Sequence, residues 1–175
     1  GWTPGVMVAT PRRLLVVWHG FTGATRAMAE AVAGAARGDA GEALEVCLLR
    51  AADAGADDVL GADAVVFATP ETLASISGAM KDFFDRSYYP LLGRCDGKPY
   101  ALVVCAGSDG EPTIAQLRRI ATGLRLREVA EPLLVRTHAQ TPEAIAARKL
   151  LPEADLARGR ELGALLAAGL ALGTY

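Results

Sequence analysis

The sequence predicts an α/β fold in which a doubly wound, five-stranded parallel sheet carries helices on both faces. Its 175 residues suit one α/β domain and are few for two. Five short segments are apolar throughout rather than alternating, which is typical of strands buried on both faces. Segments of helical length separate them, so right-handed βαβ crossovers should join the strands.

The predicted strands are short and follow one another at regular intervals. They are LLVVW (14–18), LEVCLL (44–49), AVVFA (64–68), YALVVC (100–105) and PLLV (132–135). Four predicted helices lie between and after them, over residues 24–36, 77–87, 111–124 and 153–172. Segments rich in Gly and Asp at 53–63 and 93–99 predict loops within one domain.

The chain is predicted to form a single folded domain over residues 14–175. Residues 1–13 contain no apolar run of secretory length. They are expected to be a disordered leader, either natural or left by cloning, with Met7 as a candidate start. The apolar segment that begins at Leu162 is too short for a bilayer, which needs about 20 residues. We therefore expect no membrane association and a cytoplasmic location.

Composition and charge narrow the classes of function. Hydrophobic residues make up 51% and aromatic residues 6%, which favours close packing of helices on the sheet by small side chains. A net charge of -2 leaves no broad basic surface for nucleic acid or anionic membranes. The three cysteines are widely spaced and form no C-x-x-C pair, so we expect reduced thiols and no metal site.

The first loop, residues 19–25, reads His-Gly-Phe-Thr-Gly-Ala-Thr and leads from a predicted strand directly into a predicted helix. Unpaired N–H groups and the positive end of the helix dipole make such a junction suited to an anion. Gly20 and Gly23 let the backbone wrap closely, and Thr22 and Thr25 add hydroxyl donors. The alternative is a purely structural turn that caps the helix.

Several known anion-binding loops differ from this one. A Walker P-loop needs a lysine, which the first loop lacks. A dinucleotide fingerprint needs three glycines where the first loop has two, although Arg50 could meet a 2′-phosphate, which keeps an NADP-binding Rossmann fold open. A phosphate-receiver domain would have acidic residues where Trp18-His19 and Ala68-Thr69 stand, and is rejected.

Two motifs carry a family resemblance. The T-G-x-T core at residues 22–25 resembles the FMN-phosphate loop of flavodoxin-like proteins. The segment SGAMKDFFDR at 77–86 is similar to the helix that follows a proline-led loop in flavodoxin-like NAD(P)H-dependent FMN and quinone reductases. The resemblance extends from Leu14 to the terminal helix. It implies the flavodoxin-like sheet order 2-1-3-4-5, with FMN bound at the carboxyl ends of the strands.

The resemblance assigns the flavin to three loops. The first loop would hold its phosphate, the second loop (residues 70–75) would border the isoalloxazine, and the third loop (residues 105–109) would follow its pyrimidine edge, where backbone donors stabilise charge on the reduced ring. The implied FMN-binding residues are His19, Gly20, Phe21, Thr22, Gly23, Ala24, Thr25, Pro70, Glu71, Thr72, Leu73, Ala74, Ser75, Cys105, Ala106, Gly107, Ser108 and Asp109. Structural alternatives stay open: a locally bonded His19, a buried Cys105 thiol, and a loop acid or helix cap at Asp109.

The sequence also departs from the family pattern. Gly20 stands where this loop often has Ser or Thr, which removes one hydroxyl from the phosphate site. Leu73 and Ala74 stand in place of the Trp and Tyr that sandwich the flavin in electron-carrier flavodoxins, which implies one open flavin face. The residues that could help to line the space above that face are Phe21, Tyr88 and Tyr89.

The leading functional hypothesis is an FMN-dependent oxidoreductase that passes electrons from NAD(P)H to a quinone or similar small acceptor. No catalytic side chain is expected, because flavin N5 carries the chemistry. One alternative is a flavodoxin, a one-electron carrier without its own substrate turnover, which the mild net charge disfavours. Another is a domain that has lost its flavin or its activity. Because the resembled reductases commonly form dimers or tetramers, a homo-dimer or tetramer is a further implication.

Overall fold

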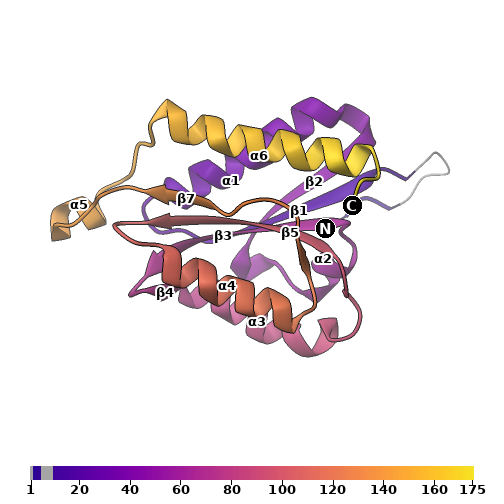
Figure 1. Ribbon diagram of the computed structural model, residues 1–175, viewed down its shortest axis with the longest axis horizontal. Coiled ribbons are helices and arrows are strands. Elements are labelled where there is room, and N and C mark those ends of the chain that lie inside the picture. Colours follow the sequence, from indigo (N-terminus) through magenta and orange to yellow (C-terminus); the bar gives the residue numbers. More distant parts are fainter. Residues whose placement is uncertain (1, 5–9) are drawn as a thin grey trace.

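A parallel sheet lies between two layers of helices in the computed structural model, which describes residues 2–4 and 10–175 (Figure 1). One layer is formed by α1 (Ala24–Ala40) and α6 (Glu153–Ala171). The opposite layer is formed by α2 (Ala56–Leu60), α3 (Gly78–Leu91) and α4 (Glu111–Gly123). The predicted α/β architecture, with helices on both faces of the sheet, is confirmed.

The sheet has the predicted strand order. Its parallel strands are β1 (Arg12–Trp18), β2 (Leu44–Arg50), β3 (Ala64–Thr72), β5 (Pro99–Ala106), β6 (Arg127–Glu128) and β7 (Leu133–Arg136). They are arranged as β2-β1-β3-β5, and both β6 and β7 pair with β5. The order 2-1-3-4-5 is therefore confirmed, with the fifth position divided between two short strands. Pro132, just before β7, has no N–H to donate to a ladder at this interruption.

The structure contains seven strands over the described ranges where the sequence predicts five. Two of the seven, β6 and β7, share one predicted position. The other addition is β4 (Ser75–Ile76), which folds back on β3 as an antiparallel hairpin. A strand of two residues is too short to show periodicity in a sequence, which is why β4 and β6 are absent from the prediction.

Two helices of a single turn lie where no helix is predicted. α2 occupies part of a predicted loop, and α5 (Pro142–Ala146) lies between β7 and α6. Each begins with a local cap: the Asp58 carboxylate accepts from the Gly55 N–H, and the Thr141 hydroxyl accepts from the Ala144 N–H. Helices of this length leave no hydrophobic period in the sequence. Two 3-10 turns flank β2, at Gly41–Ala43 and Ala51–Asp53.

Strand β1 supplies both faces of the core. Leu14 and Val16 pack in the cluster that contains α1 and α6, whereas Leu15 and Val17 pack in the cluster that contains α3 and α4. All four side chains are fully buried. Because successive side chains of a strand point to opposite faces, a strand covered on both sides is apolar throughout.

Small residues bring α6 close to α1. A Cβ at Gly163 would collide with the carbonyl oxygen of Val32, and one at Gly159 would lie 3.0 Å from Cε of Met28. The sequence predicts small side chains between helices and sheet, and the structure shows glycines of this kind also between two helices. This contact fixes the position of α1, whose first residues form part of the candidate site described below.

The first strand begins at Arg12 rather than at the predicted Leu14. Part of the predicted leader contacts the domain, because Nε1 of Trp2 donates to the Asp58 carbonyl at 3.0 Å. The Arg13 guanidinium also lies 5.3 Å from the centre of the Trp2 ring. The candidate start at position 7 lies outside the described residues.

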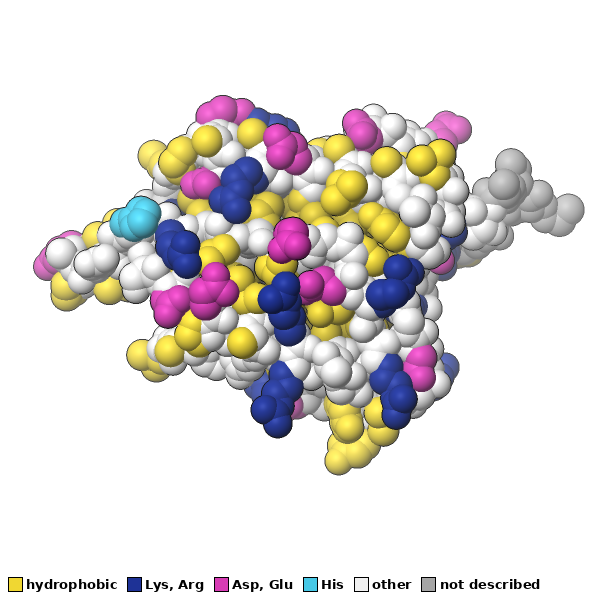
Figure 2. All heavy atoms as spheres, viewed as in Figure 1, with side chains coloured by type: hydrophobic (Ala, Val, Ile, Leu, Met, Phe, Trp, Pro, Cys, Tyr) yellow, Lys and Arg dark blue, Asp and Glu magenta, His cyan; other side chains and the backbone are white. Residues whose placement is uncertain are grey.

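Within the described ranges, no helix is both long enough and apolar enough to cross a membrane. On the face of the molecule shown in Figure 2, basic and acidic side chains are interspersed, with hydrophobic side chains visible between the two helix layers. Neither sign of charge forms a broad patch on that face. Charge there is therefore balanced locally.

Candidate functional site

A cavity of about 580 Å³ opens at the carboxyl ends of β1, β3 and β5, where the three predicted loops meet. Its volume lies in the range of small-molecule and cofactor sites. The strand order reverses between β1 and β3, which is where open α/β sheets bind ligands. The predicted residues that line the cavity are Phe21, Thr22, Ala24, Thr25, Pro70, Glu71, Thr72, Leu73, Ala74, Cys105, Ala106, Gly107 and Ser108.

The remaining predicted residues belong to the same three loops but do not line this cavity. They are His19, Gly20, Gly23, Ser75 and Asp109. At Gly20, the Cβ of a larger residue would lie 3.3 Å from the Cβ of Thr25, so the Ser or Thr that the resembled family often has here would press on Thr25.

The start of α1 is left open toward the first loop. Gly23 is its N-cap with φ of 103°, a left-handed conformation that favours glycine, and no side chain caps the helix. The first turn holds no acidic residue that would compensate the positive end of the helix dipole. Thr22 adds a half-buried hydroxyl, whereas the buried Thr25 hydroxyl is hydrogen-bonded to the Cys105 thiol. This end of α1 is suited to an anion.

Leu73 and Ala74 form the turn of the β3–β4 hairpin at the cavity. Thr72 pairs with Ser75 across the hairpin, and both turn residues have positive φ, 51° and 61°. Two positive values in a two-residue turn are typical of type I′, which favours Asn and Gly because other residues are strained there. Leu73 is nevertheless 96% exposed. The strained turn therefore holds an apolar side chain at the cavity. Strained backbone of this kind is common at ligand-binding sites.

Glu71 lines the cavity, but its carboxylate caps α4. It accepts hydrogen bonds from the Gly110 N–H (3.0 Å), the Thr113 N–H (3.3 Å) and the Thr113 hydroxyl (2.8 Å). The start of α4 is thus compensated by a negative charge, in contrast to the start of α1. Ser75 is also engaged within the protein, since its hydroxyl donates to Oε1 of Gln116 at 2.9 Å.

The third loop approaches the chain that follows β7. A Cβ at Gly107 would lie 2.9 Å from the carbonyl oxygen of Ala139, so glycine permits this approach. Burial raises the pKa of Cys105 to about 12, and the thiol therefore stays protonated and unreactive at neutral pH. Asp109 is exposed and its carboxylate accepts from the Glu111 N–H at 3.2 Å. Both side chains thus have the structural roles left open as alternatives.

His19 forms hydrogen bonds with neighbouring parts of the protein. Its Nδ1 shares a hydrogen bond of 2.7 Å with the buried Ser77 hydroxyl, and its N–H donates to the Ala68 carbonyl at 3.1 Å. Its ring meets the Phe21 ring edge to face, with centroids 4.6 Å apart. Partial burial lowers the pKa of His19 below its ordinary value. The residue is therefore neutral at physiological pH and orients the base of the first loop.

The structure adds a segment that the sequence prediction missed, the strap (residues 137–151). Its contributions to the cavity wall are Thr137, Ala139, Ile145, Ala146 and Lys149. The N–H of Lys149 donates to the Thr22 carbonyl at 2.7 Å, and its Nζ lies 3.4 Å from the Thr22 hydroxyl. These two residues are 127 positions apart. A single lysine in a polar segment carries no local signal that could have identified it.

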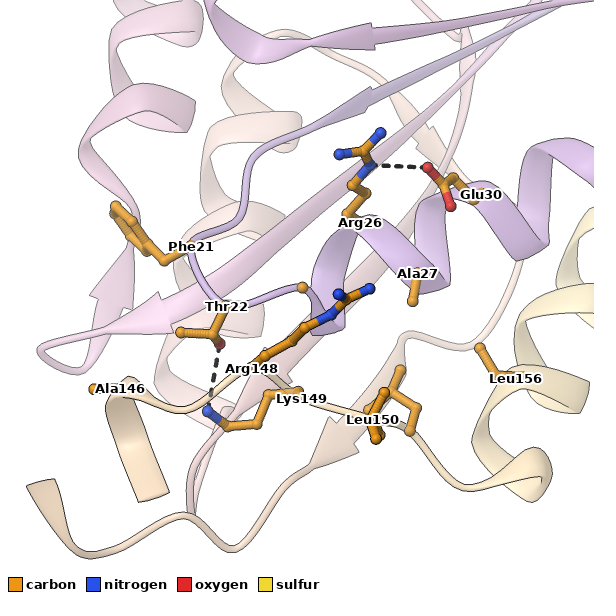
Figure 3. A pocket seen from close by; sticks show the side chains of 12 residues that line it. Phe21, Thr22, Arg26, Ala27, Glu30, Ala146, Arg148, Lys149, Leu150 and Leu156 are labelled. Carbon is orange, nitrogen blue, oxygen red and sulfur yellow. Dashed lines mark hydrogen bonds and ion pairs between the residues drawn. The ribbon is translucent and has the colours of Figure 1, made fainter. Parts of the chain in front are cut away.

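A second cavity, of about 840 Å³, lies on the other side of this contact (Figure 3). Phe21, Thr22, Ala146 and Lys149 line both cavities. The residues that line only the second are Gly23, Arg26, Ala27, Glu30, Arg148, Leu150, Leu151 and Leu156. The first loop and the strap thus form the wall between two adjoining hollows.

Other residues considered as ligand contacts are engaged elsewhere. The Tyr88 and Tyr89 rings meet edge to face on α3 with centroids 5.2 Å apart, and neither lines the first cavity. The Arg50 guanidinium lies 5.6 Å from the centre of the Trp18 ring, a cation–π contact. Among the residues that the structure describes, no cluster of three or more His, Cys, Asp or Glu side chains could hold a metal ion.

The sheet order and the position of the cavity define a flavodoxin-like protein. The structure of a flavodoxin from the domain Archaea superposes with a TM-score of 0.73 at 19% sequence identity, covering 90% of this chain and 98% of that chain. A WrbA-like flavodoxin from Agrobacterium tumefaciens gives a TM-score of 0.69 at 23% identity, covering 90% and 96%. Identities at this level show a shared fold.

The sequence carries the assignment further. The model of the NADPH-dependent FMN reductase family matches residues 15–141, and the chain belongs to this family of flavodoxin-like FMN oxidoreductases. Membership excludes the NADP-binding Rossmann alternative. A flavodoxin of Aquifex aeolicus (strain VF5) is 38% identical over 96 residues, which are 55% of this chain and 49% of that protein. The chain thus spans about half the length of this relative.

Proposed function

We propose that this chain binds FMN in the cavity between the three loops and passes electrons from NAD(P)H to a quinone or similar small acceptor. The observation that carries the proposal is the uncapped start of α1, which meets a cavity of cofactor size in a chain of the FMN reductase family. An open helix end with a threonine hydroxyl beside it provides donors for a phosphate monoester.

The residues present fit an FMN molecule. The first N–H groups of α1 and the Thr22 hydroxyl would hold its phosphate at the first loop. Leu73 and Ala74 would hold part of the ring system, and backbone N–H groups at Gly107 and Ser108 would be available to its pyrimidine edge. When bound, the flavin supplies hydride and electron transfer.

The protein's own contribution is binding and orientation. Holding the flavin and its partner with reacting atoms about 3–3.5 Å apart makes the transfer effectively unimolecular. No side-chain acid or base takes part. His19 is neutral and bonded to Ser77, and the Cys105 thiol is buried and protonated.

The exposed side chains around the cavity favour a reductase. Among the described residues that line the cavity there is neither Trp nor Tyr, and Phe21 is the one aromatic side chain. Leu73 and Phe21 are 96% and 68% exposed. A ring with one accessible face lets a nicotinamide and an acceptor contact the flavin in turn, as a two-step reductase requires.

Visible spectroscopy tests this proposal. The protein is loaded with FMN and desalted, and its absorbance is recorded before and after anaerobic NADPH, and again after a quinone is added. We expect a retained flavin band that NADPH bleaches and the quinone restores. A protein that elutes without flavin after loading contradicts FMN binding itself.

One observation favours a second function, that of a one-electron carrier. The relative at 38% identity is named a flavodoxin. For a carrier, the flavin band persists in NADPH, and stepwise chemical reduction gives a long-lived half-reduced spectrum. The same titration therefore distinguishes the carrier from the reductase.

A further inference from the structure

We propose that Lys149 makes the site specific for a flavin that carries a phosphate, and that the bound phosphate stabilises the contact between the strap and the first loop. The inference rests on the proposed FMN binding and extends it to a residue beyond the family match, which ends at residue 141. Lys149 acts as a specificity-determining residue and takes no part in electron transfer.

The position of Lys149 is defined by contacts with Thr22. Its backbone N–H donates to the Thr22 carbonyl at 2.7 Å, and its ammonium lies 3.4 Å from the Thr22 hydroxyl. Figure 3 shows the side chain directed from the strap toward Thr22. The ammonium therefore reaches the T-G-x-T core, where the phosphate is proposed to bind.

The charge of Lys149 has no acidic partner. Its ammonium donates to the carbonyls of Ile145 (2.9 Å) and Ala147 (2.6 Å), and within the described ranges no carboxylate lies at ion-pair distance. Arg148, its neighbour, likewise forms no ion pair within the described ranges. Arg26, which lines the second cavity with Arg148, is by contrast paired with Glu30 at 2.9 Å.

The unpaired positive charges of Lys149 and Arg148 thus lie near the N-terminus of α1, where no acidic residue compensates the positive end of the helix dipole. A phosphate monoester carries between one and two negative charges at neutral pH, and ammonium–phosphate hydrogen bonds are stronger than those between neutral groups. A Walker loop has its lysine within the loop. Here the fold brings one to the first loop from a distant part of the chain.

The same contacts couple the ligand to the strap. The carbonyls that Lys149 binds, those of Ile145 and Ala147, lie at the end of α5. One ammonium therefore connects the end of α5 with the first loop. A phosphate that engages this ammonium adds a further contact between the strap and the first loop, so the strap, in which the Arg148 side chain is exposed, should open to a protease less often.

Flavin affinity provides the first test. Dissociation constants of FMN and riboflavin are measured by fluorescence quenching for the unaltered protein, for Lys149→Met and Lys149→Arg, and for Lys81→Met as the control. Lys81 is an exposed lysine on α3, paired with Asp85 and absent from both cavities. Circular dichroism establishes that each variant is folded.

We expect Lys149→Met to weaken FMN binding by roughly tenfold to a hundredfold, the effect of one lost hydrogen bond to a charged group. Riboflavin affinity should not change, Lys149→Arg should recover most of the loss, and Lys81→Met should behave as the unaltered protein. An equal loss for FMN and riboflavin, or no loss for FMN, overturns the role of Lys149. Failure of the unaltered protein to bind FMN instead contradicts the proposed function.

Limited trypsinolysis provides a readout independent of affinity. Trypsin can cut after Arg148 in every form, including Lys149→Met. We expect saturating FMN to slow this cleavage in the unaltered protein, riboflavin to leave it unchanged, and saturating FMN to give no protection in Lys149→Met. Cleavage at the same rate with and without bound FMN in the unaltered protein overturns the stabilisation of the strap by the phosphate.

Discussion

His19 shows how a residue that resembles a ligand contact can serve the protein instead. The family resemblance implies that it binds FMN, and the sequence also allows a local structural role. The structure places its Nδ1 2.7 Å from the Ser77 hydroxyl and excludes it from the cavity wall. Its charge state matters for stability because burial lowers its pKa.

The lowered pKa of His19 predicts a loss of stability in acid. The unfolded chain binds a proton near the ordinary pKa of 6.5, whereas the folded protein resists protonation until a lower pH. This contribution is complete above pH 6.5 and is lost as the pH falls through the folded pKa. Urea unfolding between pH 5 and pH 8 should show a smaller decline for His19→Gln than for the unaltered protein. Parallel curves for the two proteins exclude this role.

Glu71 is a second residue whose role depends on a distant partner. Its carboxylate caps α4 through Gly110 and Thr113. We expect Glu71→Gln to lower the free energy of unfolding by about 1–2 kcal/mol, because the cap loses its charge and part of its hydrogen bonding. The matched control is Glu30→Gln, which breaks an exposed i, i+4 pair worth about 0.3–0.5 kcal/mol. Equal losses in the two variants count against the cap.

At the scale of elements, the contact between α1 and α6 positions the first loop. Gly163→Ala should lower the free energy of unfolding by about 1–3 kcal/mol, because the added methyl group collides with the Val32 carbonyl. Gly34→Ala is the control on α1, where a Cβ meets nothing within 4 Å, and it should raise stability by about 0.5–1 kcal/mol. Urea unfolding of the two variants measures both changes. A stabilising Gly163→Ala contradicts the close approach of the helices.

The β3–β4 hairpin has a strained turn whose two residues, Leu73 and Ala74, also line the cavity. The double variant Leu73→Asn/Ala74→Gly gives the turn the residues that type I′ favours, so stability should rise by about 1 kcal/mol. FMN affinity should fall in the same variant, because the apolar side chain at the ring is lost. Urea unfolding and flavin fluorescence measure the two effects. A variant with unaltered FMN affinity removes Leu73 from the flavin site.

At the scale of the whole molecule, a bound flavin should stabilise the fold that builds its site. A ligand that binds only the folded chain at 100 times its Kd adds about 2.7 kcal/mol to the free energy of unfolding. Thermal unfolding with and without FMN should show this shift in the unaltered protein. Thr22→Glu should abolish it, because a carboxylate at the first loop repels the phosphate. A shift that persists in Thr22→Glu rejects the phosphate position.

The sequence by itself determined the architecture and the three loops. Continuously apolar strands, amphipathic helices and a Gly/Thr loop before a helix are local patterns, each complete within a few neighbouring residues. Most of the predicted site residues line one cavity because parallel strands present their carboxyl ends at the same edge of a sheet. The T-G-x-T core and the segment at 77–86 also indicated the family that the comparisons show.

Only the tertiary structure decided which side chains bind one another across that edge. Glu71 caps a helix that begins 40 residues further on in sequence, and Lys149 meets Thr22 across 127 positions. The division of the fifth strand and the two one-turn helices were also beyond prediction. Contacts of this kind depend on strand order, loop length and helix position together, and no single segment encodes them. The sequence thus specified the Gly/Thr loop before α1, and the fold supplied the cation beside it.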